Sequence, residues 1–376
     1  MTVTLSQCST RMSRMHRVRA RRLTTFAAAT LAGAMQSATG RGVQPSTIVS
    51  EPSPAIIQHQ ADASFESYRF RDGETLPGLR IHYTTLGQPH KNAAGSVDNA
   101  ILLLHWTNAG SQALLTAEYK EALFAPGAPL DANRHFVVIP DNIGHGQSSK
   151  PSDGLKAAFP HYGYGDMVEL QHKLVVEALG ITHLRAIVGM SMGCMNAWQW
   201  SEDYPDSMDG IMPIACFPAA ISGRNLLWRR ILVDSIESDP SGGTAFAIAR
   251  MMIDGVPNLQ QEVRSPEAAD AFLRAIKTQA AGQDANNVVY AFESSRDFNA
   301  EPGLSQIKSK VYALNFADDE FYRDSLQVLQ HDIQQVHQGR VATRQASVGS
   351  AGHFTMSHPA LWRDQVQVFM KWSETP

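Results

Sequence analysis

Acidic residues are absent from the first fifty positions of the chain, although the whole sequence of 376 residues contains 36 of them. The same segment carries six arginines between positions 11 and 22, then a short apolar stretch at 23–34 and small residues to 38. A basic region, a short apolar region and small residues at a cleavage point are typical of a secretory signal peptide. We therefore predict a signal peptide over residues 1–38 and an exported protein; an organellar presequence and a plain basic tail are the alternatives.

Long apolar runs are also absent. After residue 38 no run approaches the roughly 18 residues of a membrane span, so no membrane-spanning segment is predicted. Because residues 1–38 hold six of the 32 basic side chains, their removal leaves 26 basic against 36 acidic groups, a formal charge of −10. Such an acidic chain is a poor match for nucleic acid or an anionic membrane. A small molecule is the predicted partner.

Cysteine is scarce, with three residues in the chain, and Cys8 falls within the predicted signal peptide. Cys194 and Cys216 both lie in apolar segments, so the prediction is two buried thiols rather than a disulfide. The metal-binding patterns CxxC and HExxH do not occur in the sequence. We predict neither a metal nor an organic cofactor.

The order of apolar segments predicts an α/β fold. Residues 39–60, with three prolines, are predicted to be a linker, and the alternating segments around Asp72-Gly73 predict a β-hairpin at the edge of a sheet. Buried apolar runs then alternate with helical periodicity, which indicates a parallel sheet with helices on both faces. The predicted strands are residues 100–104, 136–140, 184–189, 210–216, 310–317 and a short one near 345–348.

The alternation breaks after Pro218, where about ninety residues have a helical pattern and no clear strand. We interpret residues 218–308 as a helical lid inserted into the α/β domain. The domain core is then predicted as residues 61–217 and 309–376, closed by a helix at 359–372.

Residues 187–200 read IVGMSMGCMNAWQW, in which Ser191 lies between Gly189 and Gly193 in a G-x-S-x-G pattern. A strand-like run precedes the serine and a helix-like run follows it. In that context the glycines leave room for a sharp strand-to-helix turn, which lifts the serine hydroxyl above the carboxyl edge of the sheet. Ser191 is therefore the candidate nucleophile.

Two more reactive groups follow strand ends further along the chain. Asp318 and Asp319 come directly after strand 310–317, and His353 lies just before the last helix. A serine hydroxyl needs a histidine to take its proton, and that histidine needs a carboxylate to fix its tautomer. The order serine, acid, histidine fits a nucleophile on a strand-to-helix turn of this kind. Residue chemistry alone does not separate Asp318 from Asp319.

The negative charge that develops on an attacked carbonyl needs two backbone N–H donors. Met192, directly after the serine, is one candidate, and Thr107, in the loop after strand 100–104, is the other. His145 is interpreted as a structural turn residue. Four aromatic residues are left open between a cavity wall and plain core: Trp106, Trp198, Phe217 and Trp228.

These segments resemble the α/β-hydrolase superfamily, and more closely its homoserine O-acetyltransferase-like branch, from about Phe65 to Trp372. The resemblance rests on the segments PDNIGHGQSSKPSDGL, GMSMGCMNAWQW, YPDSMDGIMPIA and NFADDEF. It implies an α/β-hydrolase fold with a mostly parallel sheet and a helical lid. It also implies Ser191 as the nucleophile, Asp319 as the acid and His353 as the base.

The chain departs from that branch at two positions near the reacting serine. Trp106 stands where relatives commonly have glycine or alanine, and Cys194 stands where the second elbow glycine is usual. An exported enzyme would also lack acetyl-CoA. We therefore predict a serine hydrolase that cleaves a carboxylic ester or lactone. An acyl-CoA-dependent O-acyltransferase is the alternative, and a non-catalytic binding protein on the same fold is the second.

Overall fold

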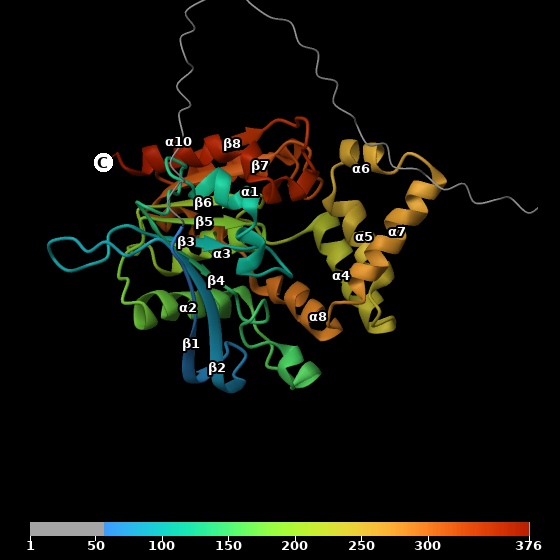
Figure 1. Cartoon of the computed structure of the whole chain (residues 1–376), viewed down its shortest axis with the longest axis horizontal. Coiled ribbons are helices and arrows are strands. Elements are labelled where there is room, and N and C mark those ends of the chain that lie inside the picture. The colour runs from blue at the N-terminus through green and yellow to red at the C-terminus, as the bar shows by residue number, and fades with distance from the viewer. Residues whose placement is uncertain (1–55, 376) are drawn as a thin grey trace, which may run out of the picture. The chain divides into compact units, whose positions relative to one another are not determined.

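The computed structural model describes residues 56–375, and its core is an eight-stranded sheet with helices on both faces (Figure 1). The spatial order of the strands is β1-β2-β4-β3-β5-β6-β7-β8, and only the β1–β2 and β2–β4 pairs are antiparallel. The strands are β1 (Gln58–Arg69), β2 (Thr75–Leu86), β3 (Ala100–Leu104), β4 (Phe136–Pro140), β5 (Ala186–Met190), β6 (Gly210–Ile214), β7 (Lys310–Phe316) and β8 (Gly339–Arg344).

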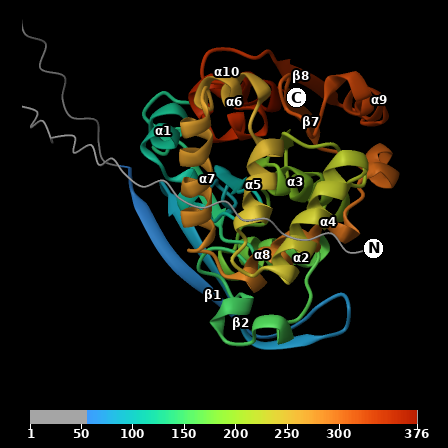
Figure 2. The same cartoon turned by 90° about the vertical axis from the view of Figure 1, so that its right-hand side faces the viewer.

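Helices follow most of the parallel strands and cover both faces of the sheet (Figures 1 and 2). They are α1 (Ala117–Tyr119), α2 (Tyr164–Lys173), α3 (Met192–Asp203), α4 (Gly223–Ser238), α5 (Gly243–Ile253), α6 (Val256–Glu262), α7 (Pro266–Ala280), α8 (Ala285–Glu293), α9 (Val328–Asp332) and α10 (Arg363–Ser373). This arrangement confirms the predicted fold class, a mostly parallel sheet between layers of helices.

The central strands are buried on both faces because alternate side chains of a strand point to opposite sides. In β3, Leu102 and Leu104 belong to one apolar cluster, while Ile101 and Leu103 belong to a second. The first cluster includes Trp198 of α3, and the second includes Phe369 of α10. The uniformly apolar strand that the sequence predicted is thus a consequence of two hydrophobic layers.

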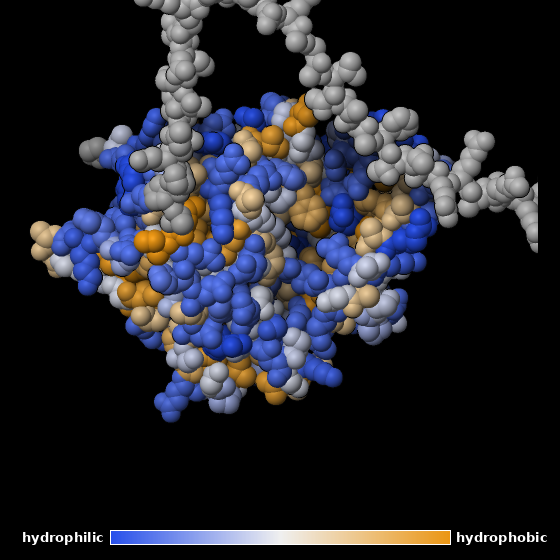
Figure 3. Space-filling view, viewed as in Figure 1, coloured by the Kyte–Doolittle hydropathy of each residue, from blue (hydrophilic) through white to orange (hydrophobic). Residues whose placement is uncertain are grey.

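Between β6 and β7 the described chain contains helices and no strand. Figures 1 and 2 show α4, α5, α6 and α7 grouped at one end of the sheet, and in Figure 3 the surface is hollowed between them and the sheet domain. Residues of α4, α5 and α8 share a cavity with Ser191, which follows the last residue of β5. The inserted helices therefore lie over the carboxyl ends of the parallel strands.

Two sequence-based boundaries were wrong. The predicted strand near 345–348 is loop, and β8 spans Gly339–Arg344 instead, because this edge strand is half-exposed and has no buried apolar run to reveal it. β1 begins at Gln58, inside the predicted linker, with exposed polar residues. The predicted signal peptide at 1–38 and the rest of the linker up to residue 55 lie outside the described residues.

No helix within residues 56–375 is both long and apolar enough to cross a bilayer. The same residues hold no group of three or more His, Cys, Asp or Glu side chains placed to bind a metal ion.

Candidate active site

Ser191 lies in a sharp turn between β5 and α3. Its backbone has φ 53° and ψ −108°, a positive-φ conformation that residues other than glycine rarely adopt. A Cβ atom on Gly189 would overlap the carbonyl oxygen of Gly193, and one on Gly193 would overlap the carbonyl oxygen of Leu104. The two glycines are therefore required by close backbone approach, as the sequence pattern predicted.

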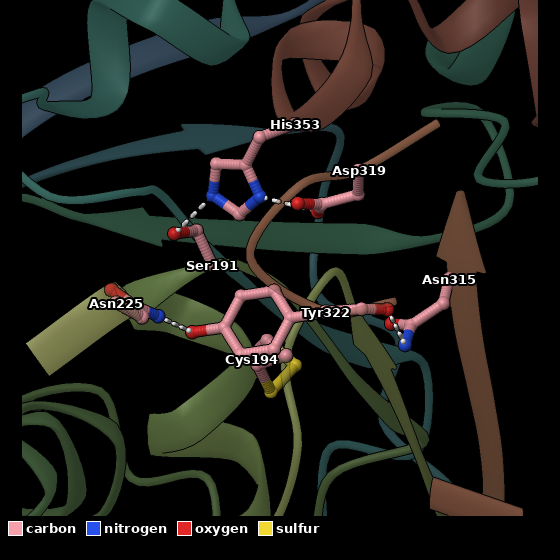
Figure 4. Close-up of a disulfide and its surroundings, with 8 residues drawn as sticks. Ser191, Cys194, Asn225, Asn315, Asp319, Tyr322 and His353 are labelled. Atoms are coloured by element: carbon pink, nitrogen blue, oxygen red, sulfur yellow. Dashed lines mark hydrogen bonds and ion pairs between the residues drawn. A yellow bond between two sulfur atoms is a disulfide. The ribbon is translucent and has the colours of Figure 1, made fainter. Parts of the chain in front are cut away.

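Ser191, His353 and Asp319 lie in one hydrogen-bonded line (Figure 4). The Ser191 Oγ is 2.8 Å from His353 Nε2, and His353 Nδ1 is 2.6 Å from Asp319 Oδ2. All three residues are buried, with relative exposures of 5%, 4% and 1%. With the carboxylate accepting the Nδ1 proton, His353 Nε2 is left as an acceptor for the serine proton.

The neighbouring aspartates have different partners, which separates the two candidates that the sequence left open. Asp319 faces His353 through Oδ2, and its Oδ1 accepts the Phe321 backbone N–H at 2.8 Å. Asp318 points to the other side, where its Oδ2 accepts the backbone N–H of Gly352 at 3.0 Å. Asp318 therefore holds the loop that carries the histidine and does not touch the ring.

Thr107 and Met192, the predicted backbone donors, come from two segments that are tied together next to Ser191. Met192 is the first residue of α3, and the Gly193 N–H donates to the His105 carbonyl oxygen at 3.1 Å. His105 Nε2 also accepts the Asn142 N–H at 3.1 Å, and burial lowers the pKa of His105, so its ring stays neutral in this role. Thr107 lies two residues further on and lines the same cavity as Ser191.

His145 lies behind this loop and is fully enclosed. Its Nδ1 donates to the Ile143 carbonyl oxygen at 3.0 Å, and it is absent from the cavity wall. Burial, with a smaller contribution from neighbouring His105, lowers the pKa of His145 to about 3. A neutral imidazole that supports a turn agrees with the structural role predicted for it.

A cavity of about 170 Å³ adjoins Ser191 and His353 beneath the inserted helices. Of the four aromatic residues left open by the sequence, Trp106 and Trp228 line it, whereas Trp198 is fully buried in the core and Phe217 packs behind Tyr322. The other large apolar wall residues are Leu232, Phe246, Ile253, Phe292, Phe321, Phe354 and Met356. A cavity of this size and lining fits a small, mainly apolar group.

One wall of the cavity is polar and positively charged. Arg229 of α4 is 6% exposed and donates to Asn225 Oδ1 at 3.1 Å and to Ser295 Oγ at 3.3 Å. Within residues 56–375 no carboxylate lies at ion-pair distance from it. The buried hydroxyls of Thr107 and Tyr164 lie nearby, and the Tyr164 hydroxyl is within reach of both Thr107 and Arg229. Within the described residues, a buried cation that has no carboxylate partner and two hydroxyls beside it is suited to an anionic group.

The family model of the alpha/beta hydrolase fold matches residues 110–314, which is more than half of the chain. The chain belongs to the α/β-hydrolase fold family. A homoserine O-succinyltransferase of Pseudomonas entomophila is 27% identical over 345 residues, covering 85% of this α/β hydrolase and 86% of the relative. A homoserine O-acetyltransferase of Leptospira biflexa is 32% identical over 206 residues and is matched over about half of its length. These relatives confirm the predicted family and branch.

Solved structures of esterases and of acyltransferases share the fold of this α/β hydrolase. An acetylester hydrolase from Corynebacterium glutamicum superimposes with a TM-score of 0.73 at 20% identity, over 84% of this chain and 96% of the other. A homoserine O-acetyltransferase from Bacillus anthracis superimposes with a TM-score of 0.70 at 21% identity, over 84% of this chain and 98% of the other. The backbone is therefore common to proteins with both kinds of activity.

The prediction of two buried thiols was wrong, because Cys194 and Cys216 form a disulfide in this α/β hydrolase. The residues are 22 positions apart, but the first turn of α3 passes beside the end of β6 and brings their Cα atoms to 6.0 Å. No cysteine spacing in the sequence signals this pairing. Arg229 was also missed, since its segment has only the pattern of an ordinary amphipathic helix.

Proposed function

We propose that this α/β hydrolase cleaves a carboxylic ester through an acyl-enzyme on Ser191. The observation that carries the proposal is the line of hydrogen bonds from Ser191 through His353 to Asp319. In the first step Ser191 Oγ attacks the acyl carbonyl carbon while His353 Nε2 takes the hydroxyl proton. The backbone N–H groups of Met192 and Thr107 are the proposed donors to the oxyanion.

The second half of the reaction returns the proton and releases the acid. Protonated His353, held by Asp319, gives its proton to the departing alcohol, which leaves an ester on Ser191. A water molecule then attacks that ester while His353 takes one of its protons. When the tetrahedral adduct breaks down, the proton returns to Ser191 Oγ and the carboxylic acid departs.

We propose that water is the acyl acceptor and that the protein is exported from the cytoplasm. The basic, acid-free segment at 1–38 supports export, and so does the Cys194–Cys216 disulfide, since disulfides persist in oxidising compartments. An acyl-CoA donor is not expected in such a compartment. An O-acyltransferase is the second candidate, favoured by the relatives named homoserine O-acetyltransferase and O-succinyltransferase.

Supplying a choice of acceptors to the acyl-enzyme tests the preference for water. We expect the protein without residues 1–38 to hydrolyse p-nitrophenyl acetate at the same rate with and without homoserine. With acetyl-CoA it should release free thiol slowly, and homoserine should not speed the release. Thiol release that depends on homoserine would replace the hydrolase by the transferase. If neither substrate reacts and a fluorophosphonate does not label Ser191, a binding protein on this fold is favoured.

The buried Arg229 supports the proposal that the substrate carries a carboxylate. We expect Arg229→Met to raise KM for mono-p-nitrophenyl succinate or O-acetylhomoserine by about ten- to a hundredfold, the value of one or two hydrogen bonds to a charged group. The KM for uncharged p-nitrophenyl acetate should stay within about twofold. Steady-state kinetics on the three esters distinguish an acyl-side from an alcohol-side carboxylate.

Two further variants control for the loss of a buried charge. Arg229→Lys keeps the charge without the planar fork and should give an intermediate KM. Arg230→Met is the matched control, because this neighbouring arginine is exposed and pairs with Glu293 away from the cavity. Equal changes in KM for the charged and uncharged esters would show that Arg229 only supports the wall.

A further inference from the structure

The Cys194–Cys216 disulfide lies close to the serine turn (Figure 4). Cys194 is in the first turn of α3, three residues after Ser191, and Cys216 is the second residue after β6. Their relative exposures are 0% and 2%, so the bridge is closed to solvent. The bond joins the helix that follows the serine to the segment that leads into the inserted helices.

Both segments turn sharply where the disulfide joins them. Ser191 has φ 53° and Ala215, next to Cys216, has φ 61°, and neither is a glycine. The Ser191 N–H donates to the Ile214 carbonyl oxygen at 2.9 Å, and the Ala215 N–H donates to the Leu314 carbonyl oxygen at 2.8 Å. Strained residues of this kind persist only where the surrounding structure over-determines them. The Ser191–Ile214 hydrogen bond and the covalent bridge join the two turns, and the Ala215–Leu314 hydrogen bond ties the second turn to β7.

The segment after Cys216 reaches the other side of the site. The Phe217 ring packs edge-on against the Tyr322 ring with centroids 5.1 Å apart, and Tyr322 lies 5.7 Å from the His353 ring. The Pro218 carbonyl oxygen accepts the Ala300 N–H at 2.8 Å just before the chain enters α4. Cys216 thus lies in a contact chain that runs from the serine turn to the histidine.

We infer that the disulfide is a positioning device that keeps Ser191 Oγ aligned with His353. The inference rests on the proposed nucleophilic role of Ser191. Without the bridge, the first turn of α3 and the segment 215–218 are joined by noncovalent contacts alone, and the strained turn at Ser191 relaxes. Because a displacement of about 1 Å at a reacting group costs up to a hundredfold in rate, the loss falls on the chemical step. Substrate binding in the cavity changes little.

The test compares the oxidised protein with Cys194→Ala/Cys216→Ala and, because these truncations leave space, with the volume-conserving Cys194→Ala/Cys216→Val. We expect kcat for p-nitrophenyl acetate and the rate constant for fluorophosphonate labelling of Ser191 to fall by about ten- to a hundredfold. KM should stay within about twofold. Both rates are measured well below the unfolding temperature of each variant, so that loss of folded protein does not contribute.

A matched control separates positioning from stability. Val188→Ala deletes a buried side chain of β5, three residues before Ser191 in the other apolar cluster, so it should lower Tm and leave kcat and labelling unchanged. If the double variants lose Tm but keep kcat and the labelling rate, the disulfide is only a stabilising bond and the inference is overturned.

If neither double variant folds, the oxidised protein is reduced with dithiothreitol at graded urea concentrations. Activity is then read on the fraction that is still folded by circular dichroism. Full activity in folded, reduced protein overturns the inference, and a loss of at least tenfold supports it. Failure of the nucleophile itself is distinguished by Ser191→Ala with its disulfide intact: undiminished turnover there removes the proposed function, whatever the cysteine variants do.

Discussion

Replacing Ser191 by alanine is expected to lower kcat for p-nitrophenyl acetate by about five powers of ten, with KM nearly unchanged. The alanine keeps the backbone turn and the donors at Met192 and Thr107, but it removes the Oγ atom that lies 2.8 Å from His353 Nε2. No acyl-enzyme can then form, and the remaining rate comes from the donors and the bound geometry acting on water. Steady-state release of p-nitrophenolate, corrected for the uncatalysed reaction, measures the loss in kcat.

The matched control for this change is Ser201→Ala. Ser201 lies in the same helix, is fully buried, and donates to the Trp198 carbonyl oxygen at 2.7 Å, far along α3 from the reacting centre. We expect it to lower stability by about 1 kcal/mol and to leave kcat within twofold. A Ser191→Ala protein that retains more than a tenth of the wild-type kcat would remove Ser191 as the nucleophile.

Replacing Asp319 by asparagine is expected to lower kcat by about 10⁴-fold. The Asp319 carboxylate accepts the Nδ1 proton of His353 and stabilises the imidazolium that forms when the serine is deprotonated. An asparagine amide brings no charge, and if its N–H₂ group faces Nδ1 it favours the tautomer with the proton on Nε2, which cannot accept the serine proton. Steady-state kinetics on p-nitrophenyl acetate measure the loss in kcat.

Asp318→Asn is the control, because the two residues are adjacent and chemically identical. Its side chain would still offer a carbonyl oxygen to the Gly352 N–H, which now donates to Asp318 Oδ2 at 3.0 Å. We therefore expect less than a tenfold loss in kcat, from looser support of the loop that carries His353. A larger loss for Asp318→Asn than for Asp319→Asn would reverse the assignment of the two aspartates.

Much of the framework was accessible from the sequence because it depends on local patterns. Buried strands such as β3 and β4 appear as short apolar runs whose predicted bounds match the structure. The serine turn is marked by the glycines on each side of Ser191, which close backbone contacts require. The strand that ends before Asp318 and the loop that carries His353 follow from the same alternation of strand and helix.

The edge strand and the predicted linker were misplaced for the opposite reason. β8 and the first residues of β1 are exposed or half-exposed, so they need no apolar pattern and are held by backbone hydrogen bonds to one neighbouring strand. Propensity and burial carry little information at such positions, and hydrogen bonding to the neighbouring strand decides where these strands begin and end.

By itself, the sequence determined an α/β fold with a helical insertion, a serine turn at the end of a strand, and an acid and a histidine after later strands. Only the tertiary structure decided that Asp319 rather than Asp318 meets the histidine, since two adjacent side chains point in different directions. It also decided that Cys194 meets Cys216 and that Arg229 is buried with no carboxylate of residues 56–375 at ion-pair distance. Each of these depends on contacts between residues that are far apart in the sequence. Such residues come close together only when the helices have packed against the sheet.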